Sequence, residues 1–205
     1  MKTEYREFAF DINAEKIENG NILFGRPIVY DKETDLGDFS EIIVSGALDN
    51  ADMRDVRFIV NHDKKMIPLA RSRRNNGNST MFLEIVPEGL DIRVALDTEN
   101  NSEARALYSA VSRGDISGMS FMFIVGREEW SGLDTDYPSR KILEIKKIIE
   151  VSACTFPAYD QTFIDARSEE SKNDILERAK KDFKSKKEKE EIEKIKTIIK
   201  IKSKM

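Results

Sequence analysis

The fold class follows from a run in which large apolar residues alternate with charged or small ones, Leu90-Asp91-Ile92-Arg93-Val94-Ala95-Leu96-Asp97. An alternation of period two is typical of a β-strand that buries one face. The preceding residues agree, because Pro87-Glu88-Gly89 is a good turn sequence. The run therefore predicts one strand of an antiparallel sheet.

Further strands are predicted on both sides of this run. Segments rich in β-branched and aromatic residues, bounded by turn signals, indicate strands over residues 4–12, 21–30, 56–60, 67–72, 80–86, 116–125 and 141–154. We expect 67–72, 80–86 and 90–96 to form a meander. A helix is predicted between a cap at Asn101 or Ser102 and Gly114, and a shorter one near residues 47–53. These elements predict a mainly β protein with packed helices (α+β), built as an antiparallel barrel or sandwich.

The composition divides the chain into two parts. Of the 205 residues, 35% are charged, above the value of about 25% that is typical of globular domains. Residues 168–205 contain 13 Lys or Arg and 9 Asp or Glu, a net charge of +4, which leaves −8 for residues 1–167. We therefore predict a folded domain over 1–167 and a charged helical or disordered tail over 168–205. The tail has too few apolar residues for a core position.

Several classes of protein are excluded by the residues that the chain lacks. One cysteine and one histidine cannot supply a disulfide framework or a four-ligand zinc site. Nucleotide-binding glycine motifs and EF-hand spacing are absent, so no cofactor is expected, and only an all-carboxylate Mg²⁺ or Ca²⁺ site stays open. A net charge of −4 argues against general nucleic-acid binding. No segment resembles a membrane span or a secretory signal, which favours the cytoplasm.

Three residues are candidates for catalysis. His62, the single histidine, follows the apolar strand 56–60 and could act as a general base, although a surface turn is the plainer explanation. Ser120 lies among Met and Phe residues and could be a nucleophile or a small residue in a packed strand. Glu150 lies among Ile and Val, where a carboxylate needs a partner unless it faces water. Serine, histidine and carboxylate together permit nucleophilic catalysis.

Each of these roles has an alternative. Ser117 could replace Ser120 as nucleophile, but residues three apart in a strand lie on opposite faces, so only one can belong to the site. Asp63 could replace Glu150, although a neighbour in sequence seldom reaches the imidazole Nδ1. Cys154 could be the nucleophile of a Cys-His hydrolase.

An ordered set of short segments resembles the prohead maturation proteases of tailed bacteriophages over about residues 20–165. These proteases are similar in fold and catalytic layout to the herpesvirus assemblin proteases, so the resemblance implies an antiparallel β-barrel of the assemblin type. The similarity is carried by Phe24-Gly25-Arg26-Pro27-Ile28-Val29-Tyr30, Glu41-Ile42-Ile43-Val44-Ser45-Gly46-Ala47-Leu48, Asn61-His62-Asp63, Gly89-Leu90, Ser112-Arg113-Gly114-Asp115-Ile116-Ser117-Gly118-Met119-Ser120-Phe121, Ile149-Glu150-Val151-Ser152 and Phe156-Pro157-Ala158-Tyr159.

The resemblance also implies functional roles. His62 matches the catalytic histidine, Ser120 the nucleophile and Glu150 the third member, where assemblins use a second histidine. By analogy, oxyanion donors are expected within residues 158–167.

The implied protein is a self-associating serine endopeptidase inside the procapsid, in the host cytoplasm. It would cleave scaffold protein, N-terminal segments of the major capsid protein and itself. The alternative is a non-catalytic assembly or scaffolding protein built on a protease-like barrel.

Overall fold

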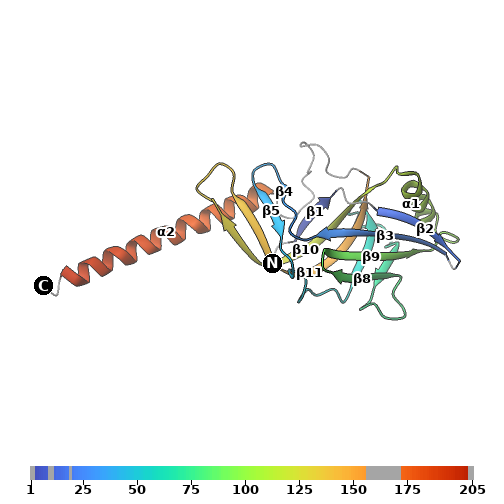
Figure 1. Cartoon of the computed structure of the whole chain (residues 1–205), viewed down its shortest axis with the longest axis horizontal. Coiled ribbons are helices and arrows are strands. Elements are labelled where there is room, and N and C mark those ends of the chain that lie inside the picture. The colour runs from blue at the N-terminus through green and yellow to red at the C-terminus, as the bar shows by residue number, and fades with distance from the viewer. Residues whose placement is uncertain (1–2, 9–11, 19, 156–171, 203–205) are drawn as a thin grey trace.

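The computed structural model describes residues 3–8, 12–18, 20–155 and 172–202. These residues form two β-sheets and two helices, joined by turns and loops (Figure 1). The protein is thus mainly β, as the sequence predicts. The predicted domain boundary at residues 167 and 168 lies outside the described residues.

The larger sheet has seven strands and is built around one long strand. Its order is β1-β10-β11-β5-β4, and β6 pairs with both β11 and β7. The strands are β1 (Glu4–Phe8), β4 (Thr34–Asp35), β5 (Ser40–Ile43), β6 (Val56–Val60), β7 (Ala70–Ser72), β10 (Gly118–Ser131) and β11 (Ser139–Cys154).

The larger sheet is mixed, so the prediction of an antiparallel sheet is wrong here. Strands β5 and β6 both pair parallel with β11, β5 at Ser139–Ile142 and β6 at Glu150–Ala153. Because β10 occupies the opposite edge of β11 along most of its length, both short strands lie on the same edge. Between β5 and β6 the chain continues along this edge, from the beginning of β11 towards its end, so β6 runs in the same direction as β5.

The smaller sheet is antiparallel, with the order β2-β3-β9-β8. It consists of β2 (Ile12–Ile17), β3 (Gly20–Val29), β8 (Met81–Val86) and β9 (Gly89–Leu96). The alternation that predicts β9 is confirmed, because its four large apolar residues are buried. Gly89 permits the close approach of β3, since a Cβ there would lie 1.9 Å from the Ile28 carbonyl oxygen. Strand pairing in the described residues gives two separate sheets and no closed barrel.

Three local predictions differ from the structure. Residues 4–12 do not form one strand, because β1 and β2 belong to different sheets. The meander is wrong at its first step, since β7 pairs with β6 while β8 pairs with β9. Residues 45–50 are turns rather than a helix, and their backbone N–H groups bond three residues back, as from Ala47 to Val44.

The predicted central helix is confirmed as α1 (Ser102–Arg113). The Asn101 side chain accepts hydrogen bonds from the backbone N–H groups of Glu103 and Ala104 at 2.9 and 3.2 Å, which caps the first turn. Gly114 ends the helix in the left-handed conformation, with φ of 78°.

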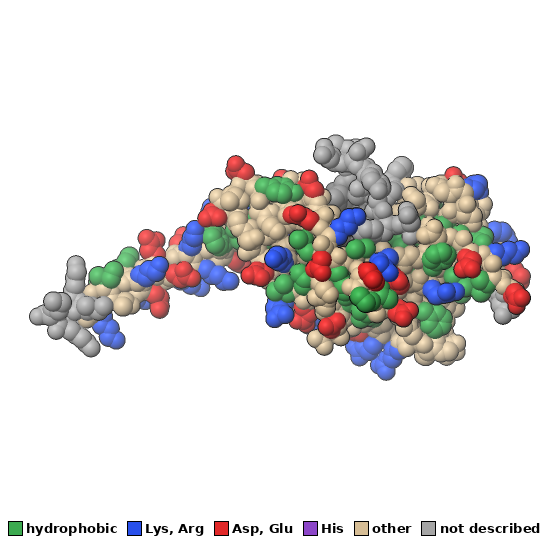
Figure 2. All heavy atoms as spheres, viewed as in Figure 1, with side chains coloured by type: hydrophobic (Ala, Val, Ile, Leu, Met, Phe, Trp, Pro, Cys, Tyr) green, Lys and Arg blue, Asp and Glu red, His purple; other side chains and the backbone are tan. Residues whose placement is uncertain are grey.

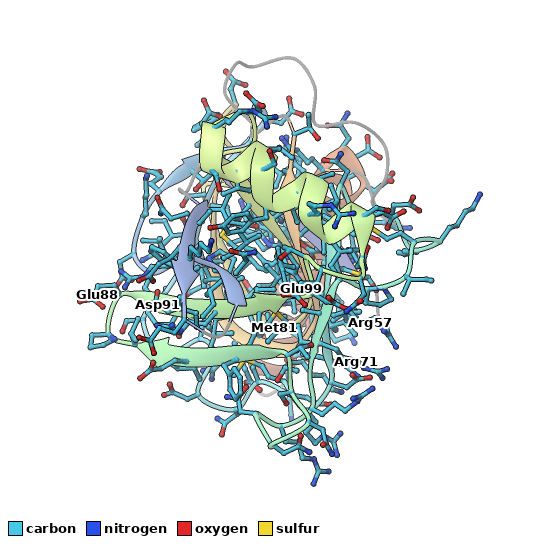
Figure 3. The ribbon with its side chains drawn as sticks, turned by 90° about the vertical axis from the view of Figure 1, so that its right-hand side faces the viewer. Arg57, Arg71, Met81, Glu88, Asp91 and Glu99 are labelled. Carbon is cyan, nitrogen blue, oxygen red and sulfur yellow. The ribbon has the colours of Figure 1, made fainter. Side chains whose placement is uncertain are left out.

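The core lies between the two sheets and beneath α1. It includes residues of both sheets, such as Met81 and Phe121, and the buried face of α1. Figure 3 shows Met81 in the interior, with Glu88 and Asp91 on one side of the molecule and Arg57 and Arg71 on the other.

A buried cluster of charges joins four strands of the larger sheet. Arg140 is fully buried and contacts Glu4 at 2.7 and 2.8 Å, Glu41 at 2.8 Å and Glu128 at 2.8 Å. Arg6 contacts Glu41 at 2.5 and 2.7 Å and Glu4 at 2.7 Å. The cluster thus ties β1 to β5, β10 and β11.

The arginines keep the buried carboxylate of Glu4 ionised. Burial alone would raise the pKa of Glu4, but hydrogen bonds and charges from Arg140 and Arg6 outweigh it and lower this pKa to about 2. A carboxyl group with a depressed folded-state pKa contributes stability above its unfolded pKa. This stability is therefore lost as the pH falls from about 4.5 towards about 2.

The tail forms one long helix, α2 (Lys172–Lys202), which extends away from the sheets (Figure 1). Its first turns are docked, because Ile175 and Leu176 are buried against Leu36 and Phe39, with Trp130 and Leu133 packed alongside. The expectation that the tail holds no core position is therefore wrong for these turns. Neither α1 nor α2, within the described residues, is long and apolar enough to cross a membrane.

We predict that Arg140→Met lowers the free energy of unfolding by about 3–5 kcal/mol, because the buried carboxylates of Glu4 and Glu41 would then share the single positive charge of Arg6. Urea denaturation measures the loss. The matched control is Arg113→Met, since Arg113 is 61% exposed and pairs with Asp115 at the surface, where a pair contributes about 0–1 kcal/mol. Equal, small losses in both variants would contradict the stabilising role of the cluster.

Candidate active site

Ser120 lies on β10 between two other strands of the larger sheet. It is opposite Glu7 of β1 and Ser152 of β11, and it is fully buried. Ser117, the alternative nucleophile, precedes β10 and is exposed. The structure therefore separates the two serines, although the reason is that Ser117 lies outside the strand rather than on its opposite face.

His62 is positioned by a turn directly after β6. Asn61 and His62 have φ values of 50° and 55°, a left-handed conformation that asparagine and histidine adopt more readily than most residues. The turn is fastened to the end of β11. The Asn61 N–H donates to the Ala153 carbonyl at 3.0 Å, and the Asn61 side chain exchanges hydrogen bonds with Thr155 at 2.8 and 2.9 Å. These contacts aim the imidazole at β10 and β11.

A continuous series of hydrogen bonds joins Ser120, His62 and Glu150. The His62 Nε2 atom lies 2.6 Å from Ser120 Oγ, and His62 Nδ1 contacts Glu150 Oε1. An ionised carboxylate can only accept, so His62 Nδ1 carries the proton and Nε2 is free to accept from Ser120. The side chains of His62 and Glu150 are only 6% and 3% exposed, which strengthens their electrostatic interaction.

Ser152 completes the support of the imidazole, a role that sequence analysis did not assign. Its hydroxyl donates to Glu150 Oε2 at 2.8 Å and accepts the His62 backbone N–H at 3.2 Å. The sequence does contain a signal for this role, because Glu150 and Ser152 are two residues apart on a predicted strand and so share one face of it.

Two further contacts come from β1 and were also missed. Tyr5 packs edge-on against His62, with ring centroids 4.6 Å apart. The Arg6 carbonyl oxygen lies 2.8 Å from Ser120 Oγ, so it competes with His62 Nε2 for the single hydroxyl proton of Ser120. These residues are more than fifty positions from their partners in the sequence, and no local sequence pattern predicts such contacts.

The other candidates lie elsewhere. Asp63 is exposed and its carboxylate accepts the Lys65 backbone N–H at 2.9 Å, so Glu150 rather than Asp63 contacts His62 Nδ1. Cys154 is buried at the end of β11, opposite Gly118. The segment expected to supply oxyanion donors, residues 158–167, lies outside the described residues. Within the described ranges, no group of three His, Cys, Asp or Glu side chains could hold a metal ion.

The arrangement can perform nucleophilic chemistry. A histidine whose Nε2 accepts a serine proton, and whose Nδ1–H is held by a carboxylate, is the combination that activates serine in hydrolases. Preorganisation is the main requirement, and here the imidazole is held by three segments that are distant in sequence.

The geometry predicts that Glu150 controls the tautomer of His62. Because the chain has one histidine, the ¹⁵N NMR spectrum of the imidazole is unambiguous. We expect the Nδ1–H tautomer to dominate the neutral ring of the unmodified protein, and Glu150→Gln to shift the population towards Nε2–H. Asp63→Asn is the control and should leave the spectrum unchanged. A spectrum that responds to Asp63→Asn but not to Glu150→Gln would contradict the observed pairing.

Comparisons with known proteins identify the family of the chain. A model of the caudovirus prohead serine protease family matches residues 8–175. A curated relative is the prohead protease of Enterobacteria phage HK97, which is 31% identical over 129 residues, or 62% of this chain and 52% of the relative. The chain therefore spans about half the length of this relative. No solved structure gave a significant match. Because the family match covers most of the sequence, the chain belongs to the caudovirus prohead serine protease family.

Proposed function

We propose that this chain is a serine endopeptidase of capsid maturation, in which Ser120 is the nucleophile, His62 the general base and Glu150 the carboxylate that orients His62. The observation that carries this proposal is the hydrogen-bonded series from Ser120 Oγ through His62 to Glu150. Membership of the prohead serine protease family supports it independently.

The roles of the three residues follow from the order of their hydrogen bonds, from Ser120 through His62 to Glu150. His62 Nε2 removes the Ser120 proton as Oγ attacks the carbonyl carbon of the substrate. The imidazolium then donates this proton to the departing amine, leaving an ester on Ser120 that water hydrolyses. Glu150 stabilises the imidazolium while both groups are shielded from solvent, and Ser152 holds the second oxygen of Glu150.

The substrates we propose are segments of the scaffold protein, N-terminal segments of the major capsid protein, and the chain itself, cleaved inside the procapsid in the host cytoplasm. The HK97 relative is a prohead protease by name, which supports this location. Cleavage of a scaffold would make assembly irreversible and free internal volume for DNA.

A non-catalytic assembly protein is the second candidate. Complete burial of Ser120 favours it, because a nucleophile must be reached by its substrate. A Cys-His hydrolase that uses Cys154 is a weaker alternative, and it predicts inactivation by iodoacetamide together with an active Ser120→Ala variant.

We predict that Ser120→Ala abolishes cleavage of the scaffold protein, with a loss of up to about a millionfold in rate, and that it leaves the fold intact. His62→Ala should be about as inactive, and the double variant no worse, because members of one catalytic unit are not additive. Gel analysis of scaffold incubated with each variant measures the rate. The control is Ser117→Ala, which changes an exposed serine three residues away. Undiminished cleavage by Ser120→Ala would exclude the proposed nucleophile.

We also propose that the outer part of α2 engages a partner, either an acidic scaffold or a neighbouring copy. Residues 186–205 contain 8 Lys and 4 Glu, a net +4, and Figure 2 shows the two signs interleaved along the helix. Four isoleucines on this part are at least half exposed: Ile192, Ile195, Ile198 and Ile199. Contact with a partner would bury this apolar surface.

A chain that ends after Ser185 should therefore keep the docked turns and fail to enter assembling shells. We expect its urea midpoint and its cleavage of a short peptide to match those of the full chain. A chain that ends at Arg167 is the control for docking, because it also loses the packing of Ile175 and Leu176 and should unfold at lower urea. Normal incorporation of the chain ending after Ser185 would remove the outer part of α2 from assembly.

A further inference from the structure

The N-terminal strand covers the candidate nucleophile. Strand β1 forms the edge of the larger sheet and pairs only with β10 among the described strands. Its register sets Arg6 opposite Phe121 and Glu7 opposite Ser120. The Ser120 hydroxyl lies 2.8 Å from the Arg6 carbonyl oxygen, so a backbone carbonyl of the chain itself is already in hydrogen-bond contact with Ser120.

We propose that β1 occupies the place of an extended substrate, so that the chain carries an internal pseudo-substrate beside Ser120. This inference rests on the proposed protease function. An extended peptide adds readily to the edge of a sheet, where main-chain hydrogen bonds give affinity and side-chain pockets give specificity. If β1 leaves, β10 becomes the edge strand and Ser120 lies on it.

The side chains of β1 define what the position accepts. Alternation along the strand directs Glu4 and Arg6 to one face and Tyr5 to the other, where Tyr5 meets His62. Arg6 is 5% exposed and is held by Glu41, whereas Glu4 is 3% exposed and is held by Arg140. The position therefore offers an anionic pocket for a guanidinium or ammonium group and a cationic pocket for a carboxylate two residues earlier.

The substrate class follows from these two pockets. It consists of extended segments with an acidic residue, any residue and then a basic residue, the pattern Glu4-Tyr5-Arg6. The carbonyl of the basic residue would face Ser120, as the Arg6 carbonyl does. Departure of β1 would leave Glu41 with Arg140 as its remaining cation and would remove Glu4 from Arg140, and the loss of buried charge pairs is costly. Exchange of β1 for a segment of the same pattern restores these pairs.

Competition between β1 and a substrate makes the protease latent. A tethered strand acts at an effective concentration on the order of millimolar, so a dilute substrate displaces it poorly. The apparent affinity for a free substrate is reduced by the fraction of molecules in which β1 has left. Cleavage therefore requires substrate segments at high local concentration or a weakened β1.

The test is a reversible covalent lock on β1 in the full chain. Tyr5 and Met122 are directly opposite each other, at a separation that allows a disulfide between Tyr5→Cys and Met122→Cys. We expect the oxidised double variant to cut scaffold protein at least tenfold more slowly than the same protein after reduction. The two single variants are the controls, and their rates should not respond to the oxidant. Mass spectrometry verifies the bond, because Cys154 is also present.

A second variant loosens β1 instead of locking it. Exchanging the charges, Glu4→Arg with Arg6→Glu, keeps the composition and sets like charges against Arg140 and Glu41. We expect scaffold cleavage at least tenfold faster than in the unmodified chain. Fluorescence polarisation then compares two labelled peptides on this variant. The peptide of residues 3–8 should bind at least tenfold more tightly than the same peptide in which the residues at positions 4 and 6 are exchanged.

The outcomes separate the two proposals. If the unmodified chain cuts the scaffold but neither the lock nor the charge exchange alters the rate, the pseudo-substrate role of β1 is overturned and the protease function stands. If neither the unmodified chain nor the charge-exchanged variant cuts the scaffold, the proposed function fails, and peptide binding still decides the role of β1. Equal binding of the two peptides, or no binding in either the exchanged or the reduced lock variant, overturns the assigned pockets.

Discussion

The buried contact of Arg140 with Glu4 and Glu41 is the interaction on which the arrangement of the larger sheet depends. Two carboxylates and a guanidinium removed from water are costly when alone and favourable only when each is paired. Because these residues come from β11, β1 and β5, the requirement for pairing selects one alignment of three strands. Arg6 satisfies the remaining carboxylate oxygens, and the same strand then lies across Ser120.

Strand β11 supplies the platform on which the candidate site is assembled. Its first half holds Arg140 and its second half holds Glu150 and Ser152. Parallel pairing with β6 brings the chain to the end of β11, and two residues with positive φ then turn His62 back over the sheet. Glu150 is ionisable and buried, and His62 gives it the partner that a buried carboxylate needs. The contacts that stabilise the fold and those that orient the imidazole are therefore continuous along one strand.

The two ends of the chain have different physical relations to the folded body. Strand β1 is held by buried charges and covers Ser120, whereas α2 is held by a small apolar contact at its first turns and is exposed beyond them. An apolar contact accepts other apolar residues of similar size, but a set of buried charge pairs accepts only a segment with matching charges. This difference makes β1 a selective occupant of its position and leaves the outer part of α2 available to other surfaces.

Much of the local structure was determined by the sequence alone. The alternation in β9 and the capping residues of α1 follow from local backbone geometry that needs no partner. Glu150 and Ser152 could be assigned to one face of a strand for the same reason. The resemblance to prohead proteases added the roles of His62, Ser120 and Glu150, which periodicity could not assign.

Only the tertiary structure decided how these elements meet. The parallel pairing of β5 and β6 with β11, the separation of β1 from β2 and the docking of α2 depend on contacts between residues far apart in sequence, which no local pattern specifies. The choice of Glu150 rather than Asp63 beside His62 required the turn at Asn61, because its positive φ values set the direction of the imidazole. The contact of Arg6 with Ser120 spans 114 residues, and it exists because buried charges hold β1 against β10.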